Sequence, residues 1–128
     1  GSLFNGVEND KKYVFIAGGT GVTPYLSLFT DDSFKDLCSP KLFLGLREKS
    51  HHLYEEDLKK ALEINSSFLS SIVYQDESGV LDISKILEEC TVDCDYFISG
   101  PPLMIKNFKD YLIDNNVSIE RVYTDDWE

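Results

Sequence analysis

The stretch with the clearest chemical character is a glycine-rich turn, Gly18-Gly19-Thr20-Gly21-Val22-Thr23-Pro24. Its three glycines allow backbone N–H groups to come close to a ligand, and the start of a helix behind them attracts an anion. The hydroxyls of Thr20 and Thr23 add donors, so we expect the turn to hold a diphosphate. These residues alone leave an alternative open, a tight strand-to-helix turn that is glycine-rich for steric reasons only.

Two common phosphate motifs do not describe this turn. No Gly-Lys-Ser/Thr follows it, as a P-loop requires, and Pro24 stands where GxGxxG has its third glycine. A second turn, Ser99-Gly100-Pro101-Pro102, precedes Leu103 and Met104. Gly100 permits close backbone approach and the prolines stiffen the start of a helix. Alone, this turn is equally typical of a rigid loop with a buried methionine.

The elements that must position these turns alternate along the chain. Strands are predicted at 13–17, 42–46, 68–74, 96–98 and 121–124, and helices after Thr23-Pro24 and at 54–64, 82–89 and 103–115. Thr23 is expected to be the first N-cap, Asp82 or Ser84 the third, and residues 75–79 a polar turn. The alternation predicts an α/β fold, a Rossmann-like doubly wound five-stranded parallel sheet with helices on both faces. Both turns then follow neighbouring central strands at the edge where such sheets bind ligands.

The composition of the chain argues against several classes of binding partner. The chain has 128 residues, enough for one domain, and a formal net charge of −11. This excess of acid argues against nucleic acid or an anionic membrane surface as partner. No apolar run is long enough to span a bilayer, so we expect no direct membrane insertion of this domain. The three cysteines suit a reducing compartment, and Cys90, Cys94 and the adjacent His51-His52 make a poor zinc set, so no metal is expected.

Taken together, the two turns resemble a known family. GGTGVTP after the first strand and SGPPLM after the fourth resemble the nucleotide-binding domain of the ferredoxin–NADP⁺ reductase family. Leu44-Gly45-Leu46-Arg47 resembles that family's second strand, and the ending from Val122 to Trp127 resembles its last. The resemblance covers essentially the whole chain. It implies a ferredoxin reductase-like, NAD-linked domain that binds NAD or NADP, with FAD or FMN on a separate N-terminal barrel.

The resemblance also implies a domain arrangement. The chain offers no room for the flavin-binding barrel before Tyr13, so we expect that barrel in a missing part of the same gene or in a separate chain. Gly1-Ser2 is typical of the remnant of a cleaved tag. Residues 3–11 are then expected to be a linker from the barrel, and residues 12–128 the NAD(P)-binding domain.

The resemblance assigns roles to individual residues. The cofactor-binding residues it implies are Gly18, Gly19, Thr20, Gly21, Thr23, Pro24, Arg47, Tyr74, Gln75, Gly100, Pro101, Pro102 and Met104. It implies a catalytic group of Ser99, where most members have cysteine beside the reacting nicotinamide, Asp125, often Glu in the family, and the terminal aromatic Trp127 near the flavin. The alternatives are that Ser99 merely ends a strand and that Trp127 packs on its own domain.

The choice between NADH and NADPH can be argued from charge. A 2′-phosphate needs basic or hydroxyl donors, and NADPH-using relatives often place Ser-Arg after the third strand. This chain has Tyr74-Gln75-Asp76-Glu77 there, and two acids repel a 2′-phosphate. Arg47 and Lys49 could instead reach the adenosine end. The sequence therefore favours NADH, with NADPH as the alternative.

These observations favour the NAD(P)H-binding half of a flavin-dependent oxidoreductase, inactive without its flavin domain. Its flavin would pass electrons to an iron–sulfur, haem or ferric acceptor, and a cytoplasmic location is expected because the nucleotide is there. The alternative is a nucleotide-binding or subunit-interaction module without turnover. A receiver or flavodoxin-like domain is disfavoured because the first strand ends in glycines rather than acids.

Overall fold

The computed structural model describes residues 11–49 and 54–126, and five strands in these ranges form one sheet. They are β1 (Tyr13–Gly18), β2 (Lys41–Leu46), β3 (Leu69–Tyr74), β4 (Asp95–Gly100) and β5 (Val122–Asp126). Their order is β3-β2-β1-β4-β5, and every neighbouring pair is parallel. The predicted α/β fold with a five-stranded parallel sheet is therefore confirmed.

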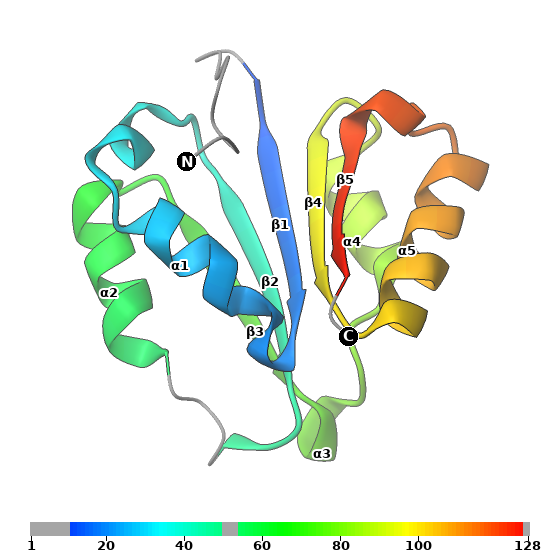
Figure 1. Cartoon of the computed structure of the whole chain (residues 1–128), viewed down its shortest axis with the longest axis horizontal. Helices are drawn as coiled ribbons and strands as arrows, with labels where there is room; N and C mark the ends of the chain where they lie inside the picture. Colours follow the sequence, from blue (N-terminus) through cyan, green and yellow to red (C-terminus); the bar gives the residue numbers. More distant parts are fainter. Residues whose placement is uncertain (1–10, 50–53, 127–128) are drawn as a thin grey trace.

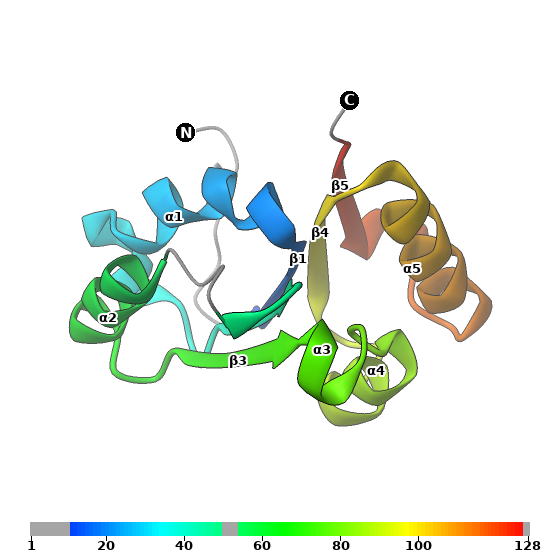
Figure 2. The same cartoon turned by 90° about the horizontal axis from the view of Figure 1, so that it is seen from below.

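Helices cover both faces of the sheet (Figures 1 and 2). One face carries α1 (Thr23–Phe29) and α2 (Glu55–Ile64), and the other carries α4 (Ile83–Cys90) and α5 (Pro102–Asp114). The short α3 (Gln75–Ser78) lies beyond the carboxyl ends of the strands, at the bottom of Figure 1. No helix within the described ranges is long and apolar enough to cross a membrane.

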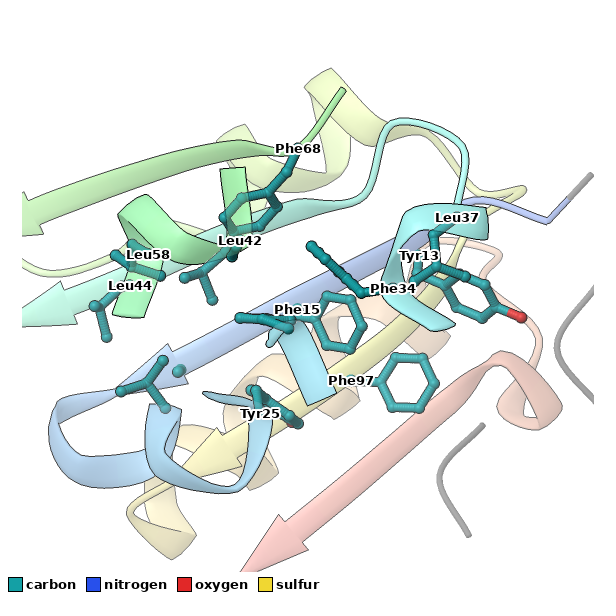
Figure 3. Close-up of a cluster of buried hydrophobic side chains, with 14 of the residues drawn as sticks. Tyr13, Phe15, Tyr25, Phe34, Leu37, Leu42, Leu44, Leu58, Phe68 and Phe97 are labelled. Carbon is teal, nitrogen blue, oxygen red and sulfur yellow. The ribbon is translucent and has the colours of Figure 1, made fainter. Parts of the chain in front are cut away.

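The two faces bury different cores. On the α1–α2 face aromatic rings dominate, and Phe15 stacks on Phe97 with ring centroids 5.1 Å apart (Figure 3). On the α4–α5 face aliphatic side chains dominate, and Ile16, Ile98 and Leu112 are fully buried. Because the central strand β1 is covered on both sides, its sequence is apolar at consecutive positions rather than at alternate ones.

Two local predictions are wrong. Thr23 does not cap α1, because a 3₁₀ turn over Gly19–Val22 runs directly into the helix and makes Val22 the N-cap. Residues 75–79, expected to be a polar turn without helix, contain the short helix α3, and Gly79 is its C-cap with φ 83°. Asp82 does cap α4, and its carboxylate accepts a hydrogen bond of 2.9 Å from the N–H of Ser84.

The reactivity of the three cysteine thiols tests how the core is packed. Cys38 is exposed, whereas Cys90 and Cys94 are buried, and burial raises the pKa of Cys90 to about 11 and also raises that of Cys94. Only the thiolate reacts with disulfide reagents. With a chromogenic disulfide reagent at pH 8, we expect Cys38 alone to react quickly and the other two thiols to react after unfolding in guanidinium. Rapid reaction of all three in the native chain would contradict this packing.

Candidate functional site

A cavity of about 760 Å³ opens at the carboxyl edge of the sheet. Its walls come from the ends of β1, β2, β3 and β4, from the first turns of α5, and from the segment that follows α3. Leu81 and Phe108 line it and belong to the core of the α4–α5 face, and the partly buried Met104, which also lines it, packs against that core. Its volume falls within the range of pockets that hold small molecules and cofactors.

The glycines of the first turn serve two purposes. A Cβ on Gly21 would lie 2.5 Å from the carbonyl oxygen of Ser99, and a Cβ on Gly18 would lie 2.8 Å from the Sδ of Met104. Gly19 differs, because its φ is 59° and no atom lies within 4 Å of the position a Cβ would take. Gly18 and Gly21 therefore allow the two turns to pack together, whereas Gly19 leaves its backbone open to a ligand.

Gly100 completes the junction between the turns. A Cβ on Gly100 would lie 3.2 Å from the amide nitrogen of Gly18 and 3.0 Å from the Cε of Met104. The parallel pairing of Ala17 with Ser99 brings the ends of β1 and β4 together. The prediction that both turns lie side by side at one edge is confirmed.

The other half of the cavity is built by the ends of β2 and β3. Arg47 and Gln75 both line it, and the N–H of Asp76 donates a 3.1 Å hydrogen bond to the carbonyl oxygen of Arg47. Gly45 makes room for Leu81, whose Cγ would be 2.9 Å from a Cβ there. This contact fixes the segment after α3 against the end of β2.

Most of the predicted cofactor-binding residues meet at the cavity. Those that line it are Gly18, Gly19, Thr20, Gly21, Arg47, Gln75, Gly100, Pro101 and Met104. Those that do not line it are Thr23, Pro24, Tyr74 and Pro102. Thr23 and Pro24 begin α1 behind the turn, and the partly buried Tyr74 packs against the aromatic core.

Ser99 and Asp125, the two predicted catalytic residues within the described ranges, do not line the cavity. Ser99 is completely buried, does not line the cavity, and pairs in register with Asp125 on β5. Asp125 is exposed. Burial raises the pKa of the Tyr25 hydroxyl on α1, and the negative charge of Asp125 raises it further. Trp127 lies outside the described residues.

Several residues of the cavity were missed by the sequence analysis. Val80 and Leu103 line it although their exposed fractions are 70% and 69%, and Asn107 lies one helical turn beyond Leu103 on α5. The spacing of Leu103 and Asn107 on a helix that starts at a recognised turn could have indicated Asn107. No sequence signal marks Val80. Within the described ranges, no group of three His, Cys, Asp or Glu side chains could hold a metal ion.

The sequence profile of the oxidoreductase NAD-binding domain matches residues 15–110. The chain therefore belongs to this family, and it is an NAD(P)-binding domain of the ferredoxin–NADP⁺ reductase family of flavin oxidoreductases.

Named relatives agree with this assignment. The Na⁺-translocating NADH-quinone reductase of Histophilus somni contains a polypeptide that is 28% identical over 136 residues, which cover 94% of this chain and 33% of that polypeptide. The corresponding polypeptide of Haemophilus influenzae is 29% identical over 137 residues, with the same coverage of both chains. The chain thus spans about a third of the length of the curated relatives it matches.

Solved structures show the same fold. A flavohaemoglobin from Malassezia yamatoensis with bound FAD and haem has a TM-score of 0.79 at 15% identity, covering 99% of this chain and 34% of that chain. A ferredoxin–NADP⁺ reductase from Plasmodium falciparum has a TM-score of 0.65 at 16% identity, covering 91% of this chain and 53% of that chain. At such low identity these similarities concern the fold alone.

Proposed function

We propose that this chain binds NADH and positions it to deliver hydride to FAD or FMN on a flavin-binding barrel domain outside the chain. Electrons then pass to an iron–sulfur, haem or ferric acceptor. The observation that carries this proposal is the cavity that joins the glycine-rich turn to the ends of β2 and β3. It provides one continuous surface for a phosphate-linked dinucleotide.

The residues of the first turn fit a diphosphate. Gly19 leaves its backbone uncovered, and the neighbouring Thr20 is exposed at the cavity. Backbone N–H groups and hydroxyls are the donors that many phosphate sites use. When bound, the dinucleotide supplies a hydride, and the chain's own residues hold and orient it.

The charges at the other half of the cavity support NADH rather than NADPH. Gln75, which lines the cavity, is neutral, and the next residues Asp76 and Glu77 are exposed acids. Their carboxylates would repel a 2′-phosphate but can accept hydrogen bonds from ribose hydroxyls. Arg47 lines the same wall, and its backbone carbonyl oxygen accepts a hydrogen bond from the N–H of Asp76.

Val80 and Leu103 offer apolar cover for the adenine ring. We expect Val80→Ser and Leu103→Ser each to weaken ADP-ribose binding about fivefold, because about 1 kcal/mol of apolar burial is lost. Ile119→Ser is the matched control, since Ile119 is 63% exposed but lies before β5 at the opposite edge of the sheet. Isothermal calorimetry measures all three. Unchanged affinity in the Val80 and Leu103 variants would contradict their contact with adenine.

The direct test of the proposal is an amide-shift titration of ¹⁵N-labelled chain with NAD⁺, NADP⁺ and 2′-phospho-AMP. We expect NAD⁺ to shift Gly19, Thr20, Gly21 and Gly100, and the 2′-phosphorylated ligands to bind more weakly. Tighter binding of the phosphorylated ligands would overturn the NADH preference and implicate Arg47. No shift up to millimolar ligand would contradict nucleotide binding itself.

A nucleotide-binding or subunit-interaction module without turnover is the second candidate. The burial of Ser99 favours it, because the side chain expected beside the nicotinamide does not line the cavity. The two candidates differ in one measurement, the anaerobic reduction of flavin by NADH in the protein that contains both this domain and its flavin barrel. Bleaching of the flavin absorbance supports the oxidoreductase, and persistent absorbance with nucleotide bound supports the module.

A further inference from the structure

Met104, the single methionine of the chain, lies where the two turns meet. A Cβ on Gly18 would be 2.8 Å from its Sδ, and a Cβ on Gly100 would be 3.0 Å from its Cε. The side chain is partly exposed and lines the cavity. A change in the size or polarity of this thioether therefore reaches both turns and the cavity at once.

We propose that Met104 is a site of reversible oxidation and that its sulfoxide weakens dinucleotide binding. The inference rests on the proposed function, because its effect is a loss of nucleotide affinity. The oxidant is hydrogen peroxide. A lone pair of the sulfur attacks one peroxide oxygen, the O–O bond breaks, and the departing hydroxide takes the proton of the transferred oxygen to become water. The sulfur loses two electrons and the peroxide gains them, and methionine sulfoxide reductases reverse the change.

The loss of affinity follows from the packing around the sulfur. A single Cβ added to Gly18 would already lie 2.8 Å from Sδ, so this side of the sulfur has no room for another atom, and the new oxygen either separates the turns or projects into the cavity. The S–O bond is strongly polar, and its oxygen carries a partial negative charge. In the cavity that oxygen would lie beside the turn that holds the diphosphate, and like charges repel.

The thiols of the chain do not compete at this site. Cys90 and Cys94 are buried, and burial raises the pKa of both thiols, so they are poorly reactive. Cys38 is exposed, but it precedes β2 and so lies toward the amino edge of the sheet, away from the cavity. Dithiothreitol reduces a disulfide or a sulfenic acid at Cys38 and leaves a methionine sulfoxide unchanged, and a variant that lacks Met104 but keeps Cys38 reports any effect of the higher cysteine oxides.

The experiment measures the affinity of the full chain for ADP-ribose by calorimetry before and after peroxide, with dithiothreitol added afterwards to restore thiols. Peptide mass spectrometry reports oxidation of Met104. We expect oxidation to weaken binding about tenfold, and methionine sulfoxide reductases to restore it. In the Met104→Leu variant, which cannot form a sulfoxide, peroxide should leave the affinity at its own starting value. Bound ADP-ribose should also slow the oxidation of Met104.

Two results would overturn the inference while leaving the proposed function intact. One is complete oxidation of Met104 with unchanged affinity, and the other is resistance of Met104 under conditions that oxidise N-acetylmethionine. A chain that fails to bind ADP-ribose before any peroxide is added would instead overturn the proposed function, and this inference with it.

Discussion

Replacing Gly21 with alanine is expected to abolish nucleotide binding and to lower the free energy of unfolding by about 2–3 kcal/mol. The new methyl group would lie 2.5 Å from the carbonyl oxygen and 2.7 Å from the carbonyl carbon of Ser99, and 3.0 Å from the Cα of Gly100. All three are backbone atoms of β4, so no side chain can rotate away to relieve the contact. The glycine-rich turn and β4 must separate, and the cavity wall that they share opens.

Gly19→Ala is the matched control for the stability part of this prediction. Gly19 has open space around its Cβ position, so its substitution meets only the conformational strain of a φ of 59°, about 1 kcal/mol. Urea unfolding followed by circular dichroism compares the stability of the two variants, and calorimetry with ADP-ribose compares their binding. Equal stability of the two variants would show that the turn does not pack on β4 as described.

Gln75→Arg is expected to tighten the binding of 2′-phospho-AMP by about tenfold to a hundredfold, which is the effect of about 1.5–3 kcal/mol from a charged hydrogen bond. Gln75 is exposed, lines the cavity, and begins α3 beside Arg47. A guanidinium there would bind the phosphate in a bidentate manner and offset the acids that follow. The affinity for ADP-ribose, which has no 2′-phosphate, should change much less. Calorimetry with both ligands measures the switch.

Ser66→Arg provides the same change of charge at a distant place. Ser66 is exposed and lies in the turn before β3, at the amino edge of the sheet. At physiological ionic strength a charge so far from the cavity is largely screened, so its effect on 2′-phospho-AMP should stay within about twofold. Equal gains in both variants would mean that net charge, rather than a contact at Gln75, sets the affinity.

The fold could be predicted because the apolar pattern of each segment and the order of the segments along the chain indicate the same architecture. Strands covered on both faces have continuous apolar runs, and the order of strands and helices leaves few topologies for a parallel sheet. The prediction failed at α3, where four polar residues, Gln75–Ser78, have no apolar periodicity. Their conformation depends on a hydrogen bond to Arg47, which lies far away in the sequence, and no local pattern encodes such a contact.

The parts of the candidate site that glycines form could be predicted from the sequence. The parts that depend on how exposed a side chain is could not. The glycines of both turns are visible in the sequence because few residues can replace them at such close approach. No feature of the sequence distinguishes Val80 from any other exposed valine. The sequence did not indicate the burial of Ser99 either, because a small polar residue at the end of a strand is compatible with a buried junction and with an open site.

The central position of β1 in the sheet also determines at which stage of folding the nucleotide site forms. Val14 pairs with Lys41 on one side and with Tyr96 on the other, and the second of these pairings closes a much longer loop of chain. The cavity needs both pairings, because its walls include the ends of β2 and β4. A partly folded chain in which β4 is not yet docked lacks the contact between the two turns and the cavity wall that this contact builds. Bound nucleotide is therefore a marker of the completed fold rather than of any intermediate on the way to it.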